Sequence, residues 1–324
     1  MPRFTRILGH IFFGLTLAAG AAWTITALGY HLSGAIYAGA IALVIIGAIT
    51  AITLRLRARR LGWAAMAALT LIIGGWYASI RPSDDRDWRF DVAHGASATV
   101  DGDIVTIANL RDFDWQDANT ATQRWDTRSY DLSQLETLDM VTSVWDNPDI
   151  AHLLVSFGFA DGEHVVWSVE IRKEAHESFS SVGGFFKQFE LVLIAATEDD
   201  ILKLRTNHRQ EDVRLYPVDL DAAQRREMFM AFVGMAQDLE QRPQFYNTIT
   251  DNCTTSVYKL ARVLKDDLPI DERLILSGKL PEYLDDLGAL KGDMPMADRR
   301  AAAAITARAM AADPAIPYSV AIRM

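Results

Sequence analysis

The sequence predicts an α+β protein in which three membrane-spanning helices precede an exported domain with an antiparallel sheet packed on helices. Charge is divided unevenly along the 324 residues: residues 1–80 hold six of the 32 basic side chains and no acidic one, which leaves 26 basic against 42 acidic side chains and a net charge of −16 for the rest. Short alternating apolar patterns follow, and then amphipathic helical patterns. This composition excludes an ordinary soluble cytosolic enzyme, and the acidic part would repel nucleic acid.

Three uncharged runs, residues 7–30, 35–54 and 61–80, are each long enough for a helix to cross a bilayer, which takes about 20 residues. A cleaved signal peptide is the alternative for the first run, but two more spans follow closely. Arginines precede the first run and separate the second from the third, whereas the loop around His31 is uncharged. Because positive loops stay inside, we expect the N-terminus in the cytoplasm and everything after residue 80 in the periplasm of a bacterial inner membrane.

The chain is thereby divided into a three-helix anchor (1–80), a linker (81–90) and a periplasmic domain (91–324). In the domain, a hairpin around Asp101-Gly102 is predicted first. Other strands are expected at 137–145, 189–195 and 213–218. Helices are expected at 221–241, from Cys253 through Leu264, at 281–290 and at 297–312.

The clearest strand signal lies at residues 151–172, where apolar residues occupy odd positions on both sides of Ala160-Asp161-Gly162. They are Leu153, Val155, Phe157, Phe159, Val165, Trp167, Val169 and Ile171. Directly opposed residues of an antiparallel pair lie on the same face of the sheet. Each odd-numbered apolar residue must therefore oppose another odd-numbered residue, so the two residue numbers of every pair add up to an even number. A three-residue loop of 160–162, with Gly162 in the left-handed conformation, gives a sum of 322 and sets His152 opposite Glu170. A loop of 161–163 gives a sum of 324 and sets His152 opposite Arg172. We favour 322 because glycine tolerates positive φ.

Cys253 is the only cysteine, which excludes an internal disulfide and a cysteine-based metal cage. It follows Asp251 and Asn252, either of which can cap the next helix, so it should lie in a first turn where backbone N–H groups stabilise a thiolate. A lone cysteine is more often an inert buried residue. The polar neighbours favour a nucleophile instead, with His152 as its base and Glu170 orienting that base.

Other polar residues are candidates for positioning and binding. Those expected to position the thiol or to help bind an oxyanion are Asn247, Asp251, Asn252 and Thr254. Those that could bind an anionic head group are Arg172, Arg205, Asn207 and Arg209, although such a cluster is also typical of a solvated turn paired with nearby acids. The histidines do not have the spacing of a metal motif, so neither a metal nor another cofactor is expected.

Four stretches of the exported part resemble the DUF4105 family, also called the Lnb N-terminal periplasmic domain. They are VTIANLRDFDW (105–115), IAHLLVSFGFADGEHVVWSVEIRKE (150–174), GGFFKQFELVLIAATEDDILKLRTNHR (183–209) and RPQFYNTITDNCTTS (242–256). In this resemblance the family's His and Cys fall on His152 and Cys253, and its S-x-E-x-R strand falls on Ser168, Glu170 and Arg172. The arrangement is also similar to the permuted papain-like order of NlpC/P60-type proteins. The namesake of the family is a lipoprotein N-acyltransferase whose membrane segments follow the domain, whereas three precede it here.

The resemblance implies a membrane-anchored acyltransferase in which His152 activates Cys253. The thiolate would take an acyl chain from a membrane phospholipid and pass it to an amine such as a lipoprotein N-terminus. A rival reading is an amidase or peptidase that acts on cell-wall peptides with the same residues, and a non-catalytic envelope scaffold would not need the thiol. An acyltransferase requires an apolar groove, whereas a peptidase requires a polar cleft.

Overall fold

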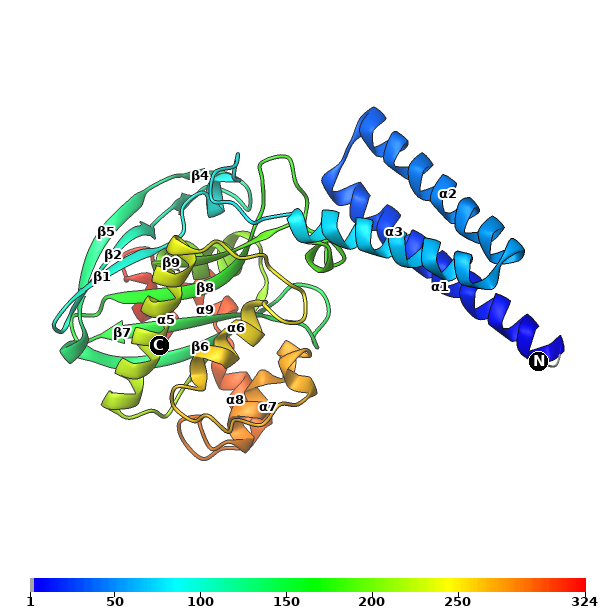
Figure 1. Cartoon of the computed structure of the whole chain (residues 1–324). Coiled ribbons are helices and arrows are strands. Elements are labelled where there is room, and N and C mark those ends of the chain that lie inside the picture. Colours follow the sequence, from blue (N-terminus) through cyan, green and yellow to red (C-terminus); the bar gives the residue numbers. More distant parts are fainter. Residues whose placement is uncertain (1–2) are drawn as a thin grey trace. The chain divides into compact units, whose positions relative to one another are not determined.

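The structure is a computed structural model that describes residues 3–324, and the chain divides into two compact units (Figure 1). The first unit comprises the chain up to Pro82 together with an inserted segment, Ser180–Gln188. The second comprises Ser83–Phe179 and Phe189–Met324. The chain therefore passes between the units three times, and the sequence analysis did not anticipate the inserted segment.

The first unit is built on three helices, α1 (Arg3–His31), α2 (Gly34–Arg57) and α3 (Arg59–Ser79). Each is long and apolar enough to cross a membrane, as the sequence predicted. Arg55 of α2 donates to the Gly9 carbonyl oxygen of α1 at 2.9 Å. Gly62 allows α3 to approach α2, because a Cβ there would lie 2.6 Å from the Arg55 Cα.

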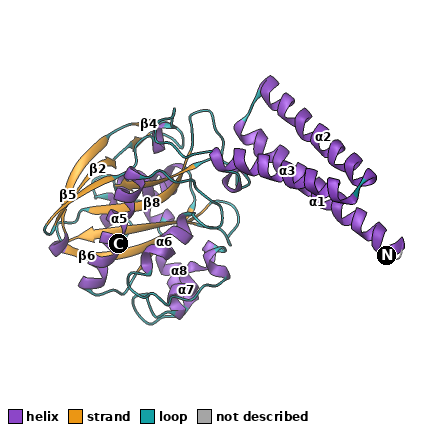
Figure 2. Ribbon diagram, viewed as in Figure 1, coloured by secondary structure: helices purple, strands orange, loops and turns teal. Residues whose placement is uncertain are grey.

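The second unit contains an eight-stranded sheet of order β1-β2-β9-β8-β7-β6-β10, with β5 also paired to β2 (Figure 2). Its strands are β1 (Ser97–Asp101), β2 (Ile104–Arg111), β5 (Trp125–Asp131), β6 (Leu135–Val144), β7 (His152–Phe159), β8 (His164–Arg172), β9 (Glu190–Ala196) and β10 (Asp212–Pro217). The sheet is antiparallel, as predicted, except that β2 and β9 pair in parallel through Arg111 and Ala196. The sequence analysis did not predict β5 or the separate two-stranded sheet, β3 (Asp114–Trp115) and β4 (Ala121–Thr122).

Helices cover both faces of this sheet. The odd-numbered face of β7 and β8 packs against α5 (Ala222–Gln241) and α6 (Cys253–Ala261), and the Trp167 ring stacks on Phe232 with centroids 5.8 Å apart. The even-numbered face packs against α4 (Glu198–Lys203), α9 (Thr306–Met310) and α10 (Tyr318–Ala321). The remaining helices are α7 (Leu280–Asp286), α8 (Met296–Ala303), the π-helical turn η4 (Leu204–His208), and the 3-10 turns η1 (Phe90–Val92), η2 (Leu132–Gln134), η3 (Gly183–Phe185), η5 (Glu272–Leu274) and η6 (Ser277–Lys279).

The β7–β8 hairpin has the predicted register. Leu154 pairs with Ser168 and Phe157 with Val165, so paired numbers sum to 322. Gly162 has a φ of +88°, and Phe159 donates its N–H to the Glu163 carbonyl at 2.9 Å. The apolar residues of both strands thus leave water together, and a one-residue slip would expose them all.

Two helix predictions need correction, and one helical stretch was not predicted. The helix after Asn252 ends at Ala261 and does not reach Leu264. The helix predicted at 297–312 is broken into α8 and α9, because Ala304 bridges to Arg214 and the Ile305 N–H bonds to the Val213 carbonyl of β10. No helix was predicted at residues 198–208, which form α4 and η4.

Candidate active site

The candidate site lies where β7 and β8 separate. Hydrogen-bonded pairing between the two strands runs from Gly158 to Leu154 and stops there, while β8 continues on its other side to β9. His152 is the first residue of β7 and pairs with Ser143 of β6. At this end of the hairpin α6 contacts both β7 and β8. A helix N-terminus therefore meets the strand that carries His152.

Cys253 is the first residue of α6, and Asn252 rather than Asp251 caps the helix. The Asn252 side-chain oxygen accepts the N–H groups of Thr254 and Thr255, each at 2.9 Å, and the Thr255 hydroxyl accepts the Asn252 N–H at 3.0 Å. This arrangement is a capping box, which provides hydrogen-bond acceptors for N–H groups in the first turn of the helix. Within residues 3–324, no group accepts the N–H of Cys253 itself.

The loop before Cys253 is closed by Asn247 and Asp251. Their backbone groups exchange two N–H···O bonds of 3.1 Å, and the Asn247 side chain accepts the N–H groups of Ile249 and Thr250 at 3.0 Å. Asp251 in turn accepts a hydrogen bond from Lys259 of α6. These two residues shape the loop that presents the thiol.

Glu170 is the centre of a set of hydrogen bonds around His152. The imidazole Nε2 lies 3.1 Å from Glu170 Oε1 and 2.8 Å from the Ser168 hydroxyl, which itself donates to Glu170 Oε1 at 2.7 Å. Arg205 donates its Nη2 to the same oxygen at 3.0 Å. Both of these contacts of the imidazole use Nε2, which leaves Nδ1 as the ring nitrogen available to act as a base.

The pKa values of His152, Cys253 and Glu170 are shifted by burial and by the charges of one another. Burial alone would lower the pKa of His152, but the Glu170 carboxylate and the hydrogen-bonded Cys253 thiol raise it to about 9. Burial would raise the pKa of Cys253, yet the hydrogen bond and charge of His152 lower it below its ordinary value. Burial also opposes ionisation of Glu170, whose pKa His152 and Arg205 nevertheless hold well below normal. The lowered pKa of the thiol and the raised pKa of the imidazole both favour a proton on His152 rather than on Cys253.

The four residues considered for head-group binding each have a partner within the chain. Each is tied to a different partner: Arg172 to Asp84 at 2.6 Å, Arg205 to Glu170 at 3.0 Å, Asn207 to the Ala309 carbonyl at 3.3 Å, and Arg209 to Glu211 at 3.8 Å. Arg205 is buried, so its guanidinium is committed to the carboxylate that orients His152.

Tyr246, which precedes the loop closed by Asn247 and Asp251, was not among the predicted site residues. Burial raises the pKa of its hydroxyl, and the charges of Cys253 and Glu170 raise it further. The Tyr246 N–H bonds to the Phe189 carbonyl at 3.0 Å and holds the segment against the start of β9. The residue lies in an irregular stretch, and no periodicity marks it. Ser168, by contrast, stood in the S-x-E-x-R motif.

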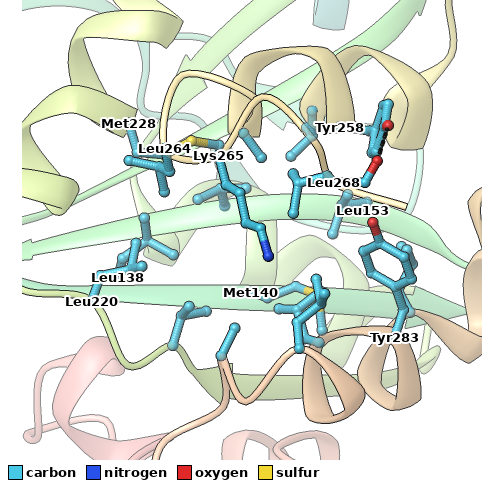
Figure 3. Close-up of a pocket in the computed structure, with 18 of the residues that line it drawn as sticks. Leu138, Met140, Leu153, Leu220, Met228, Tyr258, Leu264, Lys265, Leu268 and Tyr283 are labelled. Carbon is cyan, nitrogen blue, oxygen red and sulfur yellow. Dashed lines mark hydrogen bonds between the residues drawn. The ribbon is translucent and has the colours of Figure 1, made fainter. Parts of the chain in front are cut away.

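An apolar cavity of about 410 Å³ lies between α6 and the sheet (Figure 3). One wall is a face of α6 formed by Thr254, Val257, Tyr258 and Ala261, and the opposite wall consists of Leu138, Met140, Leu153 and Val155 from β6 and β7. Leu268, Leu280 and Tyr283 contribute further apolar surface, and the Lys265 side chain reaches across the space. Cys253 and His152 do not line the cavity, but their chain neighbours Thr254 and Leu153 do.

Comparison with known proteins gives one match. Residues 121–281 match the family model described as the Lnb N-terminal periplasmic domain, and this range includes His152, Ser168, Glu170, Arg205 and Cys253. No curated protein and no solved structure matches the chain. With its three candidate spans, the chain is a membrane protein with a periplasmic domain. It belongs to the Lnb N-terminal periplasmic domain family.

Proposed function

We propose that this protein is a thiol-dependent acyltransferase of the bacterial inner membrane. It takes an acyl chain from a phospholipid ester as a thioester on Cys253 and passes the chain to an amine, such as the N-terminus of a lipoprotein. The observation that carries this proposal is the apolar cavity beside a Cys–His–Glu arrangement, because the same arrangement next to a polar cleft would favour a peptidase.

Acylation begins with attack of the Cys253 thiolate on the ester carbonyl carbon, which forms a C–S bond and a tetrahedral oxyanion. The Cys253 N–H, which has no other acceptor within the described residues, is the first donor available to that oxygen. When the intermediate collapses, the C–O bond breaks and the His152 imidazolium gives its proton to the departing alkoxide. The products of this half-reaction are a thioester and a lysophospholipid.

Deacylation reverses these roles. His152, now neutral, takes a proton from the attacking amine, a C–N bond forms, and the C–S bond breaks. The thiolate leaves and pairs again with the imidazolium, so protons and charges return to their starting positions. Glu170 stays ionised throughout, because Ser168 and Arg205 both donate to its Oε1.

The size and lining of the cavity suit a single acyl chain. If a methylene takes roughly the 30 Å³ that a water molecule takes in the liquid, the 410 Å³ cavity holds a chain on the order of 14 carbons. Each methylene moved out of water contributes about 0.8 kcal/mol. Polar groups of the lining such as Gln224 and Lys265 are too few to satisfy the backbone of a bound peptide.

The orientation of the anchor supports a periplasmic reaction. Arg55, Arg57, Arg59 and Arg60 lie in or beside the short connection between α2 and α3, and basic loops remain on the cytoplasmic side. With an odd number of spans, we expect the second unit in the periplasm, where it would meet phospholipids of the outer leaflet. A reporter fused after Met324 should be active only outside the cytoplasm, and activity inside it would contradict this orientation.

Intact-mass analysis of the full-length protein in phospholipid nanodiscs tests the chemistry. With donor lipids of one defined acyl chain, we expect a mass increase equal to that acyl group, removed by neutral hydroxylamine and absent from Cys253→Ala. Adding an amine acceptor should discharge the adduct into an N-acyl product. Cleavage of cell-wall peptides without any acyl adduct would instead establish the peptidase alternative. Inertness toward both substrates, in a sample with the circular dichroism of folded protein, would favour a scaffold.

A further inference from the structure

Residues 180–188, which we call the interfacial segment, leave the sheet between β8 and β9 and pack in the first unit. On the side of α1, the Phe186 ring stacks on Tyr30 with centroids 5.6 Å apart and lies 5.7 Å from the Trp23 ring. His31 Nε2 lies 2.8 Å from the Phe186 carbonyl oxygen. These contacts hold the segment at the C-terminal end of α1.

The interfacial segment also contacts the C-terminal end of α3. The Tyr77 hydroxyl donates to the Phe185 carbonyl oxygen at 3.3 Å. Lys187 donates its Nζ to the Tyr77 carbonyl at 3.0 Å, and the same ammonium lies 4.6 Å from the centroid of the Tyr77 ring. The segment therefore joins two candidate spans at the ends opposite the arginine-rich connection.

Two large apolar side chains of the interfacial segment stay exposed despite these contacts. Val182 is 52% exposed and Phe185 is 44% exposed. Aromatic residues that typically mark a membrane–water boundary lie on the adjoining helix ends, namely Trp23, Tyr30, Trp76 and Tyr77. An apolar surface continuous with lipid-facing helices fits the bilayer boundary better than water.

We propose that the interfacial segment inserts Val182 and Phe185 into the phospholipid interface beside the ends of α1 and α3. Its partner is the bilayer itself, at the boundary between head groups and acyl chains. The second unit is then tied to the membrane through its sheet as well as through the linker, because the segment is followed directly by β9 and preceded, within ten residues, by Glu170. This proposal does not depend on the chemistry at Cys253.

Single-thiol labelling tests the proposal, since Cys253 is the only cysteine and Cys253→Ala leaves a thiol-free background. An environment-sensitive fluorophore is placed on Val182→Cys or Phe185→Cys in nanodiscs. Leu43→Cys, 70% exposed in the middle of α2, is the lipid control, and Asn119→Cys in an exposed loop is the aqueous control. We expect blue-shifted emission at 182 and 185, quenching by lipids spin-labelled near the head group, and shielding from iodide.

Labels at 182 and 185 that behave like the label at 119 would overturn the proposal. A second measurement needs no substitution: photoactivatable phospholipid is crosslinked to the unmodified protein, and the adducts are located by peptide mass spectrometry. Adducts on residues 180–188 are expected in addition to those on α1, α2 and α3. Adducts confined to the helices would contradict insertion even if a labelled variant failed to fold.

Discussion

The Nε2 of His152 lies 3.1 Å from Oε1 of Glu170, across two strands that no longer share hydrogen bonds at that point. Arg205 bonds to the same carboxylate oxygen, and the imidazole in turn interacts with the Cys253 thiol. Four groups of alternating charge therefore follow one another from Arg205 to the thiolate. Because each charged group lies next to a group of opposite charge, the ionised forms of Glu170, His152 and Cys253 are favoured.

The Cys253 thiol should react as a thiolate at pH values where an ordinary thiol, with a pKa of about 8.5, is mostly protonated. We expect the alkylation rate of the folded protein by iodoacetamide to stay high on the acid side of pH 8, because the His152 imidazolium lowers the pKa of the thiol. Urea-unfolded protein is the matched control and should show the ordinary profile. Superimposable curves for the folded and unfolded protein would show that the thiol is unperturbed.

Folding stability should depend on the charge of His152. Its pKa is raised to about 9 in the folded protein, against about 6.5 for an unperturbed histidine. The stability that this shift contributes is therefore complete below pH 6.5 and is lost as the pH rises through about 9. Urea unfolding of wild type and His152→Gln at pH 6 and pH 9.5 measures it, and the difference between the two proteins should be smaller at pH 9.5.

Arg205→Met should impair the site through Glu170. Losing a donor to a mostly buried carboxylate costs about 1–3 kcal/mol of stability, and it should move the pH profile of Cys253 alkylation toward that of an ordinary thiol. The KM for the lipid donor should stay close to wild type, since Arg205 is committed to Glu170. A higher KM with an unchanged alkylation profile would instead show that Arg205 binds the lipid head group. Arg209→Met is the matched control, because Arg209 makes an ion pair with Glu211 at 3.8 Å and no hydrogen bond to Glu170.

Ala261→Phe should shorten the acyl chains that the protein accepts. Ala261 lines the cavity on α6, so a phenyl group there occupies space proposed for the chain. We expect loss of the thioester adduct from long-chain donors and retention of the adduct from a four-carbon donor, measured by intact mass. Equal loss with both donors would show damage to the catalytic groups, and no change with either would place the acyl chain elsewhere.

Gly278→Ala should destabilise the protein and disturb His152. An added Cβ would lie 2.0 Å from the Pro148 carbonyl oxygen, in a turn whose Ser277 hydroxyl bonds to the backbone of Ala151. Such overpacking typically costs about 1–3 kcal/mol. Gly234→Ala in α5 is the control, since its Cβ meets nothing within 4 Å and alanine favours a helix by roughly 0.5–1 kcal/mol. The two substitutions should shift the thermal midpoint in opposite directions, and a shift of the same sign would contradict the packing argument.

Much of the local structure follows from the sequence because it depends on the periodicity of apolar residues and on the residue types at turns and helix termini. Uncharged runs of about 20 residues can only satisfy their backbone in lipid as helices, and the three candidate spans agree with the prediction. Apolar residues at odd positions predict both faces of the β7–β8 hairpin, and Gly162 selects its three-residue loop. A cap at Asp251 or Asn252 was predictable in the same way, since a cap bonds to N–H groups only two and three residues ahead, and the structure selects Asn252.

Only the tertiary structure decides which of these elements meet. Cys253 and His152 are 101 positions apart, and they come together because the apolar face of α6 packs against the same sheet that ends at His152. Arg205 reaches Glu170 from a π-helical turn on the opposite face, so its role as a partner of the carboxylate carries no sequence signal. The break between α8 and α9 has a similar cause, since the bond from Ile305 to Val213 of β10 overrides a continuous helical pattern. Local preferences are worth tenths of a kcal/mol per residue, whereas burial of a large side chain contributes about 1.5–3 kcal/mol, so long-range packing determines where the elements lie.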